Sequence, residues 1–216
     1  MSFKKYPKSD QDRKNRRDTD SISSNDIGTG DTKSVYQTGL YNEAFWLRER
    51  RKDTCNCYSF ACNISVDKFT ADPGYGYRDD NEFLNSLRDL EEGIKQDGLV
   101  KILDGTPVEQ IIGTIDKPSW KVAAFYWTDD EGRLGYHFFR EVYEEFDINL
   151  KPLCIPRWAH KFHTNFPTIK KHNGDGIITN PEAEMKSLPI NHARGQAPSL
   201  LGYYLVKPDA YICTPG

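Results

Sequence analysis

The chain has 216 residues, a mass of 24.8 kDa and a mean hydropathy of −0.72, so it is long enough for one medium-sized domain with its own core. A formal net charge of −3 does not suggest a general nucleic-acid-binding protein. No stretch approaches the roughly 20 apolar residues of a membrane span, and no apolar region follows the basic N-terminus as in a secretory signal. We therefore expect synthesis in the cytoplasm without a Sec signal, with any export left to a specialised secretion system.

Residues 1–34 are predicted to form a disordered polar tail. Eight Lys or Arg residues and six Asp residues give this segment a local charge of +2, and Ser, Asn, Asp and Gly dominate its second half. So few apolar residues cannot offset the conformational entropy that folding would cost. Residues 35–216 then form one folded domain, and a docking or export role is the alternative for the tail.

The first half of this domain is predicted to be mainly helical. Residues 41–50 favour a short helix, and apolar residues at spacings of three and four predict a longer one over Asp79–Gln96, with Gly98 ending it. A short strand is expected over residues 99–103. Thr106 followed by Pro107 is typical of a helix start.

The second half is predicted to consist of strands. Residues 120–127 and 134–140 are β-prone and are joined by a hairpin turn over 128–133. Further strands are expected at 157–162, 176–179 and 200–206. Helices followed by strands favour an α+β domain with an antiparallel sheet.

Three of the five cysteines lie within eight residues, in the stretch TCNCYSFACN that begins at Thr54. Structural zinc would be expected to use CxxC knuckles, which are missing here, although Cys154, His160 and His163 are possible further ligands. A relaxed disulfide is not expected between cysteines two residues apart. A regulatory disulfide and inert packing remain alternatives to a reactive thiol.

The residues around Cys57 favour the reactive thiol. Ser59 to Cys62 are compact or apolar, which suits a buried helix, and a start near Asn56 would place Cys57 in the first turn. Unpaired N–H groups and the helix dipole there favour a thiolate. The alternative is that Cys57 is a small buried hydrophobic residue.

A nucleophilic cysteine also needs a base and a group that orients the base. His137 interrupts an otherwise aromatic strand, and His160 lies on the strand expected next. Because residues on neighbouring antiparallel strands face one another, we expect these two histidines to lie side by side. The alternative for His137 is a histidine with a purely structural role in the sheet.

The stretches Asn56–Ala61, Gly135–Arg140 and Trp158–Lys161, in that order, resemble the papain-like cysteine hydrolases of the NlpC type, which are bacterial cell-wall amidases and peptidases. The resemblance covers roughly residues 54 to 206 and implies a papain-like catalytic domain over 35–216, with the nucleophile's helix packed on a small antiparallel sheet. His137 and His160 are 23 positions apart, about twice the family spacing. An insertion over Glu141–Leu153 would account for the difference.

The resemblance implies a catalytic triad of Cys57, His137 and His160, with Asn180 or Asp175 as alternatives for the third group. The oxyanion would be held by the N–H of Cys57 and by Gln37 or Tyr41. Neither a metal nor another cofactor is needed.

The implied substrate is a peptide of peptidoglycan, and the implied biological role is an effector toxin, with an immunity protein or a secretion system as possible partners. A host-protein-directed cysteine protease or deamidase would use the same groups. A non-enzymatic binding domain with a structural Cys57 is the remaining alternative.

Overall fold

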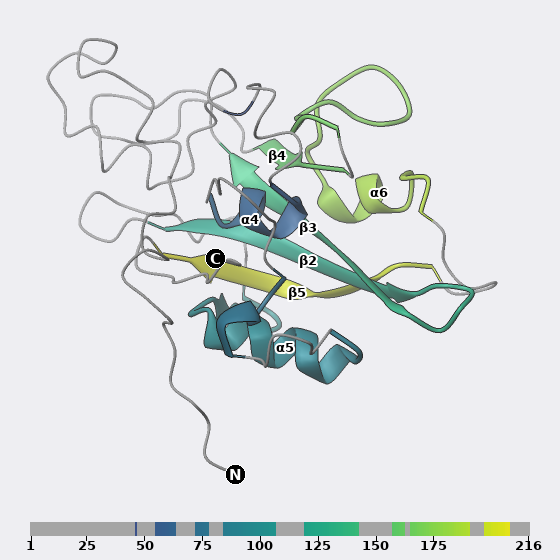
Figure 1. Ribbon diagram of the computed structural model, residues 1–216. Coiled ribbons are helices and arrows are strands. Elements are labelled where there is room, and N and C mark those ends of the chain that lie inside the picture. Colours follow the sequence, from purple (N-terminus) through teal and green to yellow (C-terminus); the bar gives the residue numbers. More distant parts are fainter. Residues whose placement is uncertain are drawn as a thin grey trace, which may run out of the picture.

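The computed structural model describes residues 46, 55–63, 72–77, 84–106, 119–142, 157–162, 165–190 and 197–207 (Figure 1). Helices and strands alternate with turns along these segments. The elements are α4 (Cys57–Ala61), the 3-10 helix η3 (Tyr75–Tyr77), α5 (Leu87–Gln96), β1 (Val100–Lys101), β2 (Trp120–Thr128), β3 (Leu134–Val142), β4 (Arg157–His160), α6 (Pro181–Met185) and β5 (Ser199–Val206).

The five strands form one antiparallel sheet in the order β1-β5-β2-β3-β4. β2 and β3 form its centre as a long hairpin, in which Phe125 lies opposite His137 and Trp127 opposite Gly135. The predicted α+β class is therefore confirmed at the level of a mixed fold with an antiparallel sheet. Among the described residues, no helix is long and apolar enough to cross a membrane.

The hairpin turn between β2 and β3 is held by Asp129. Its side chain accepts hydrogen bonds from the backbone N–H groups of Glu131 and Arg133, both at 2.9 Å. Gly132 adopts a φ of 77°, a conformation that favours glycine. The turn lies where the sequence predicts it.

α5 begins later than the sequence predicts. Leu84 and Asn85 are not helical, and Ser86 caps the helix by accepting the backbone N–H of Asp89 at 3.2 Å. Leu84 lies before the helix but packs on the same core as the helix does. The apolar residues therefore keep a helical spacing in the sequence beyond the point where the helix begins. The predicted end is confirmed, because Gly98 follows the C-cap with a φ of 87°.

α4 has only five residues, and a capping box starts it. The Asn56 side chain accepts the N–H of Ser59 at 2.8 Å, while the Ser59 hydroxyl accepts the N–H of Asn56 at 3.0 Å. At the other end, Trp120 donates to the carbonyl of Ala61 at 2.8 Å, and buried Arg140 donates to Asn63 at 2.6 Å. The helix is thus held at both ends by side-chain hydrogen bonds in addition to its own backbone hydrogen bonds.

The sheet carries a core on each face. One face is covered by α4 and α5, whose Tyr58, Leu90 and Ile94 pack on residues of β2, β3 and β5. Met185 of α6 packs on the other face, against a cluster that contains Phe125, Phe139 and Trp158. Figure 1 shows α4 lying against the central hairpin and α5 running alongside β5.

One strand prediction is wrong. Residues 176–179 do not form a strand, and their ladder contact is a single bridge between Lys170 and Ile177. The nearby residues Asn173, Gly174 and Gly176, in the stretch HNGDG, disfavour a longer strand pairing. The predicted tail and the predicted helix after Thr106 lie outside the described residues, as does the predicted helix over 41–50 except for Trp46, which is helical.

Candidate active site

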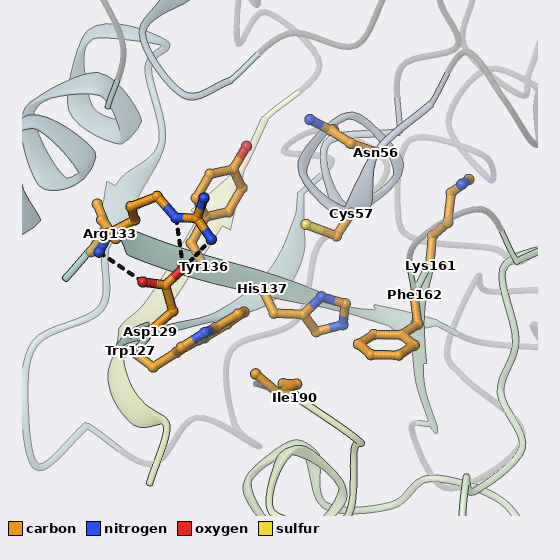
Figure 2. Close-up of a pocket in the computed structure, with 12 residues that line it drawn as sticks. Asn56, Cys57, Trp127, Asp129, Arg133, Tyr136, His137, Lys161, Phe162 and Ile190 are labelled. Carbon is orange, nitrogen blue, oxygen red and sulfur yellow. Dashed lines mark hydrogen bonds and ion pairs between the residues drawn. The ribbon is translucent and has the colours of Figure 1, made fainter. Parts of the chain in front are cut away.

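A cavity of about 500 Å³ lies at the edge of β3 and brings Cys57 and His137 together. Figure 2 shows Cys57 on one side of the His137 ring, with Trp127, Ile190 and Phe162 around its other sides. The residues that line the cavity are Asn56, Cys57, Trp127, Asp129, Arg133, Leu134, Gly135, Tyr136, His137, Lys161, Phe162 and Ile190.

The early end of β4 creates this cavity. β4 pairs with β3 from Val142 to Phe139 and stops at His160, so the first part of β3 has no strand beside it on that edge among the described residues. The next N–H along this edge belongs to Phe138, and it donates to the sulfur of Cys57. Cys57 from one face of the sheet and His137 from the other therefore meet around an open edge.

Cys57 is the first residue of α4, as the sequence predicts, but its thiol is not poised as a thiolate. Although the residue keeps part of its surface exposed, burial of the thiol raises its pKa to about 12. The N–H groups of Phe138 and Tyr58 and the charge of Lys161 lower the pKa, whereas the charge of Asp72 raises it. The expectation of a helix-stabilised thiolate is wrong, because the cost of burying the charge exceeds what one short helical turn provides.

His137 and His160 form a hydrogen-bonded pair, as their strand positions predict. Nε2 of His137 lies 2.9 Å from Nδ1 of His160, and both residues are buried. The register places His160 opposite Phe139, so the two histidines are diagonal neighbours on one face. The Phe139 ring stacks on His160 with centroids 4.7 Å apart, which fixes the plane of the imidazole.

His160 is held in its neutral form. Burial, and to a smaller extent the charge of His172, lowers the pKa of His160 to about 4. A neutral imidazole has one nitrogen that donates and one that accepts. His160 is therefore able to accept the Nε2–H of His137 throughout the neutral pH range.

Asn180 and Asp175, the two further candidates for the third group, lie away from His137. The Asn180 side chain caps α6 by accepting the N–H groups of Glu182 and Ala183, at 2.9 and 3.0 Å. Asp175 is in the exposed segment 171–176. Neither residue lines the cavity, whereas His160 contacts His137 directly.

Gln37 and Tyr41, the expected oxyanion donors, lie outside the described residues. The same holds for Cys154 and His163, which the sequence offers as possible zinc ligands. Within the described segments, no three His, Cys, Asp or Glu side chains gather as metal ligands would. Cys55, Cys57 and Cys62 do not form disulfides, and Cys55 and Cys62 are buried.

Several residues of the site were not singled out by the sequence. Tyr136 donates to Asp72, which places a carboxylate close enough to Cys57 to influence its pKa. Trp127 and Phe162 read in the sequence as ordinary strand aromatics, and only the open edge of β3 makes them part of a cavity wall. The alternation of β3 does place Tyr136 and His137 on opposite faces, but it does not show that one cavity reaches both.

The chain was compared with models of protein families, with curated proteins and with solved structures, and none of them matches it.

Proposed function

We propose that this protein is a cysteine hydrolase that cleaves an amide bond through a thioester, with Cys57 as nucleophile and His137 as base. One observation carries the proposal. Cys57 and His137 line the same cavity, and His137 is bonded at 2.9 Å to a second buried histidine. A nucleophile, a base and a group orienting the base are the three parts that such a reaction needs.

The hydrogen bond between the histidines assigns their roles. If Nε2 of His137 donates to Nδ1 of His160, then Nδ1 of His137 carries a lone pair that is able to take the thiol proton. His160 then keeps His137 in the productive tautomer and stabilises the imidazolium that forms.

The high pKa of Cys57 determines the order of events. Because that pKa is raised to about 12, the thiol is protonated in the resting protein. His137 therefore removes the proton as the sulfur attacks the carbonyl carbon, and it later gives this proton to the leaving amine. Water then hydrolyses the thioester to release the acid and regenerate the thiol.

The tetrahedral intermediate carries an oxyanion that needs N–H donors. In the capping box the N–H groups of Asn56 and Ser59 are used, and the N–H of Tyr58 is directed to the Cys57 sulfur. The N–H of Cys57 is the remaining donor of this turn, and one such donor typically contributes about 3 kcal/mol. Gln37 or Tyr41 is proposed as the second donor.

Peptides of peptidoglycan are the first substrate class to test, because the resemblance of the Cys57, His137 and His160 segments to NlpC-type hydrolases implies them. In that case the protein acts as a bacterial effector toxin. A host-protein-directed protease or deamidase would use the same three groups. The raised pKa of Cys57 favours one further candidate, a binding domain in which the thiol is structural.

Digestion of purified muropeptides and of an unstructured protein, read by mass spectrometry, tests the proposal. We expect Cys57→Ala and His137→Ala each to lose about 10³-fold or more of the activity, since each removes a reacting group. Cys62→Ala is a control outside the cavity and should retain the activity. An activity that survives both Cys57→Ala and His137→Ala would contradict the proposed mechanism.

Alkylation by iodoacetamide separates an enzyme from a binding domain without knowledge of the substrate. Cys57 is partly exposed, whereas Cys55 and Cys62 are buried, so Cys57 should react before those two. We further expect His137→Ala to slow the reaction, because the thiol depends on that base for its deprotonation. A Cys57 labelling rate that is unchanged in His137→Ala would indicate a structural thiol.

A further inference from the structure

The wall of the cavity beside His137 is apolar. Trp127, Ile190 and Phe162 line it, and Figure 2 shows Trp127 and Phe162 on opposite sides of the His137 ring. Trp127 and Phe162 also pack at the margin of the core on the α6 face, so they are supported from behind. The apolar side chains of the wall are therefore held by the core on one side and line the cavity of Cys57 and His137 on the other.

Gly135 allows Trp127 to take its place in this wall. The two residues lie opposite each other in the hairpin, and a Cβ atom on residue 135 would come within 2.2 Å of Cε2 of the indole. Such a distance is not possible, so any other residue would force the indole away. The absence of a side chain on Gly135 lets the indole lie across the backbone of β3.

The charged end of the cavity is arranged so that it does not attract an anion. Arg133 directs Nε and Nη2 to Asp129, at 2.8 and 2.7 Å, and Nη1 to Glu131 at 2.8 Å. All three guanidinium nitrogens thus face carboxylates of the same turn. Of these three residues only Asp129 and Arg133 line the cavity, so their charges cancel at this rim and the guanidinium is already neutralised by its own turn.

The second cation that lines the cavity is Lys161. The residue is only 1% exposed, and Figure 2 shows its side chain extending away from Cys57 and His137. Its charge acts on the thiol from a distance, and its ammonium group does not stand in the apolar wall. A substrate carboxylate placed beside Trp127 would thus lose its hydration without gaining a cation beside it in the apolar wall.

We infer that Trp127, Ile190 and Phe162 form a subsite that binds a large apolar side chain, aromatic or branched, next to the scissile amide, and that Trp127 over Gly135 determines this specificity. The inference rests on the proposed hydrolase, since it uses the same cavity. It ranks peptides with a bulky apolar residue above peptides that carry a carboxylate at that position. The competing explanation is that Trp127 only packs across the hairpin.

Trp127 provides its own probe of binding. The chain has four tryptophans, and Trp46, Trp120 and Trp158 are 0%, 2% and 6% exposed, whereas Trp127 is partly exposed. Quenching of fluorescence by acrylamide will therefore report mainly on Trp127. A ligand that covers the subsite should reduce this quenching.

The experiment uses the full chain with Cys57→Ser, so that binding is measured without turnover. The blocked pentapeptides AAFAA and AAEAA are titrated by isothermal titration calorimetry, which also measures binding to variants without Trp127. Quenching is the second readout in the proteins that retain Trp127. We expect AAFAA to reduce quenching and to bind at least about 10-fold more tightly than AAEAA. Adding Trp127→Ser should abolish the preference, and Gly135→Ala should weaken it by displacing the indole. Leu103→Ser, a change at a residue 78% exposed outside the cavity, is the matched control and should alter neither affinity.

The outcomes separate this inference from the proposed function. Equal binding of the two peptides, or an unchanged preference in Trp127→Ser, would overturn the subsite. Cleavage is measured separately on the protein with Cys57 intact. A binding preference for AAFAA without cleavage of any peptide would support the subsite and reject the hydrolase. Efficient cleavage of carboxylate-bearing peptides alone would support the hydrolase and reject the subsite.

Discussion

The protonation states of Cys57 and His160 decide what the cavity does near neutral pH. A thiol with a pKa of about 12 and an imidazole with a pKa of about 4 are both uncharged over a wide range around pH 7. The resting site therefore differs from a preformed ion pair of thiolate and imidazolium. Its chemistry depends on proton transfer through His137 at the moment of attack.

His160 should make the stability of the fold depend on pH. Its pKa is about 6.5 when unfolded and about 4 when folded, so the unfolded chain binds the proton more tightly. The stability that the neutral His160 contributes is complete above about pH 6.5. It is lost as the pH falls from about 6.5 to about 4. The loss is about 2 to 3 kcal/mol in the free energy of unfolding.

Urea unfolding at pH 7 and pH 4.5 measures this effect, with His160→Asn as the reference. Asn keeps a hydrogen-bond acceptor near the position of Nδ1 but does not titrate. We expect the wild-type protein to lose about 2 kcal/mol more than His160→Asn between the two pH values. An equal loss in both proteins would show that His160 is not held neutral by the fold.

At the scale of the element, α4 depends on its caps. Helices of five residues are not stable alone, since nucleation is costly and few internal bonds form. The capping box of Asn56 and Ser59, together with Trp120 and Arg140 at the other end, compensates for this. The position of Cys57 is thus set by side chains that are distant in sequence as well as by its neighbours.

Replacement of Asn56 tests the role of the cap. Asn56→Ala removes the acceptor for the N–H of Ser59 and should lower the free energy of unfolding by about 1 kcal/mol. Asn56→Ser restores a capping oxygen and should recover most of this loss. Urea unfolding of the three proteins provides the measurement. Equal stability of the Ala and Ser variants would mean that tertiary contacts alone hold the helix.

At the scale of the whole molecule, a buried carboxylate ties three segments together. Asp97, after α5, accepts the hydroxyl of Tyr58 at 2.7 Å and the N–H of Gly74 at 2.8 Å. α4, α5 and the turn before η3 therefore share one side chain. Burial, followed by the charge of Asp97, raises the pKa of Tyr58 well above its usual range, so its hydroxyl remains a donor.

Removal of the Tyr58 hydroxyl should weaken this junction. Tyr58→Phe takes a hydrogen bond from a buried carboxylate, and we expect a loss of about 1.5 to 3 kcal/mol in the free energy of unfolding. A double-mutant cycle with Asp97→Asn isolates the pair and should give a coupling of about 1 kcal/mol or more. A coupling near zero would indicate that Tyr58 acts through packing alone.

Much of the sheet follows from the sequence because its strands are long and aromatic. The predicted strands over 120–127, 134–140 and 200–206 each agree with the structure within two residues at either end. The predicted start of α5 is wrong, since Leu84 is apolar and in phase but lies before the Ser86 cap. The papain-like arrangement and the catalytic roles stay predictions.

The amino-acid order by itself determined the α+β class, the helix that begins at Cys57 and the pairing of His137 with His160. These features depend on local periodicity, capping residues and strand neighbours, all of which are visible in one chain. The tertiary structure alone decided the protonation of the thiol and the shape of the cavity. The reason is physical: burial and the open edge of β3 arise only when Phe138, Asp72 and Trp127, distant in sequence, are brought around Cys57 and His137.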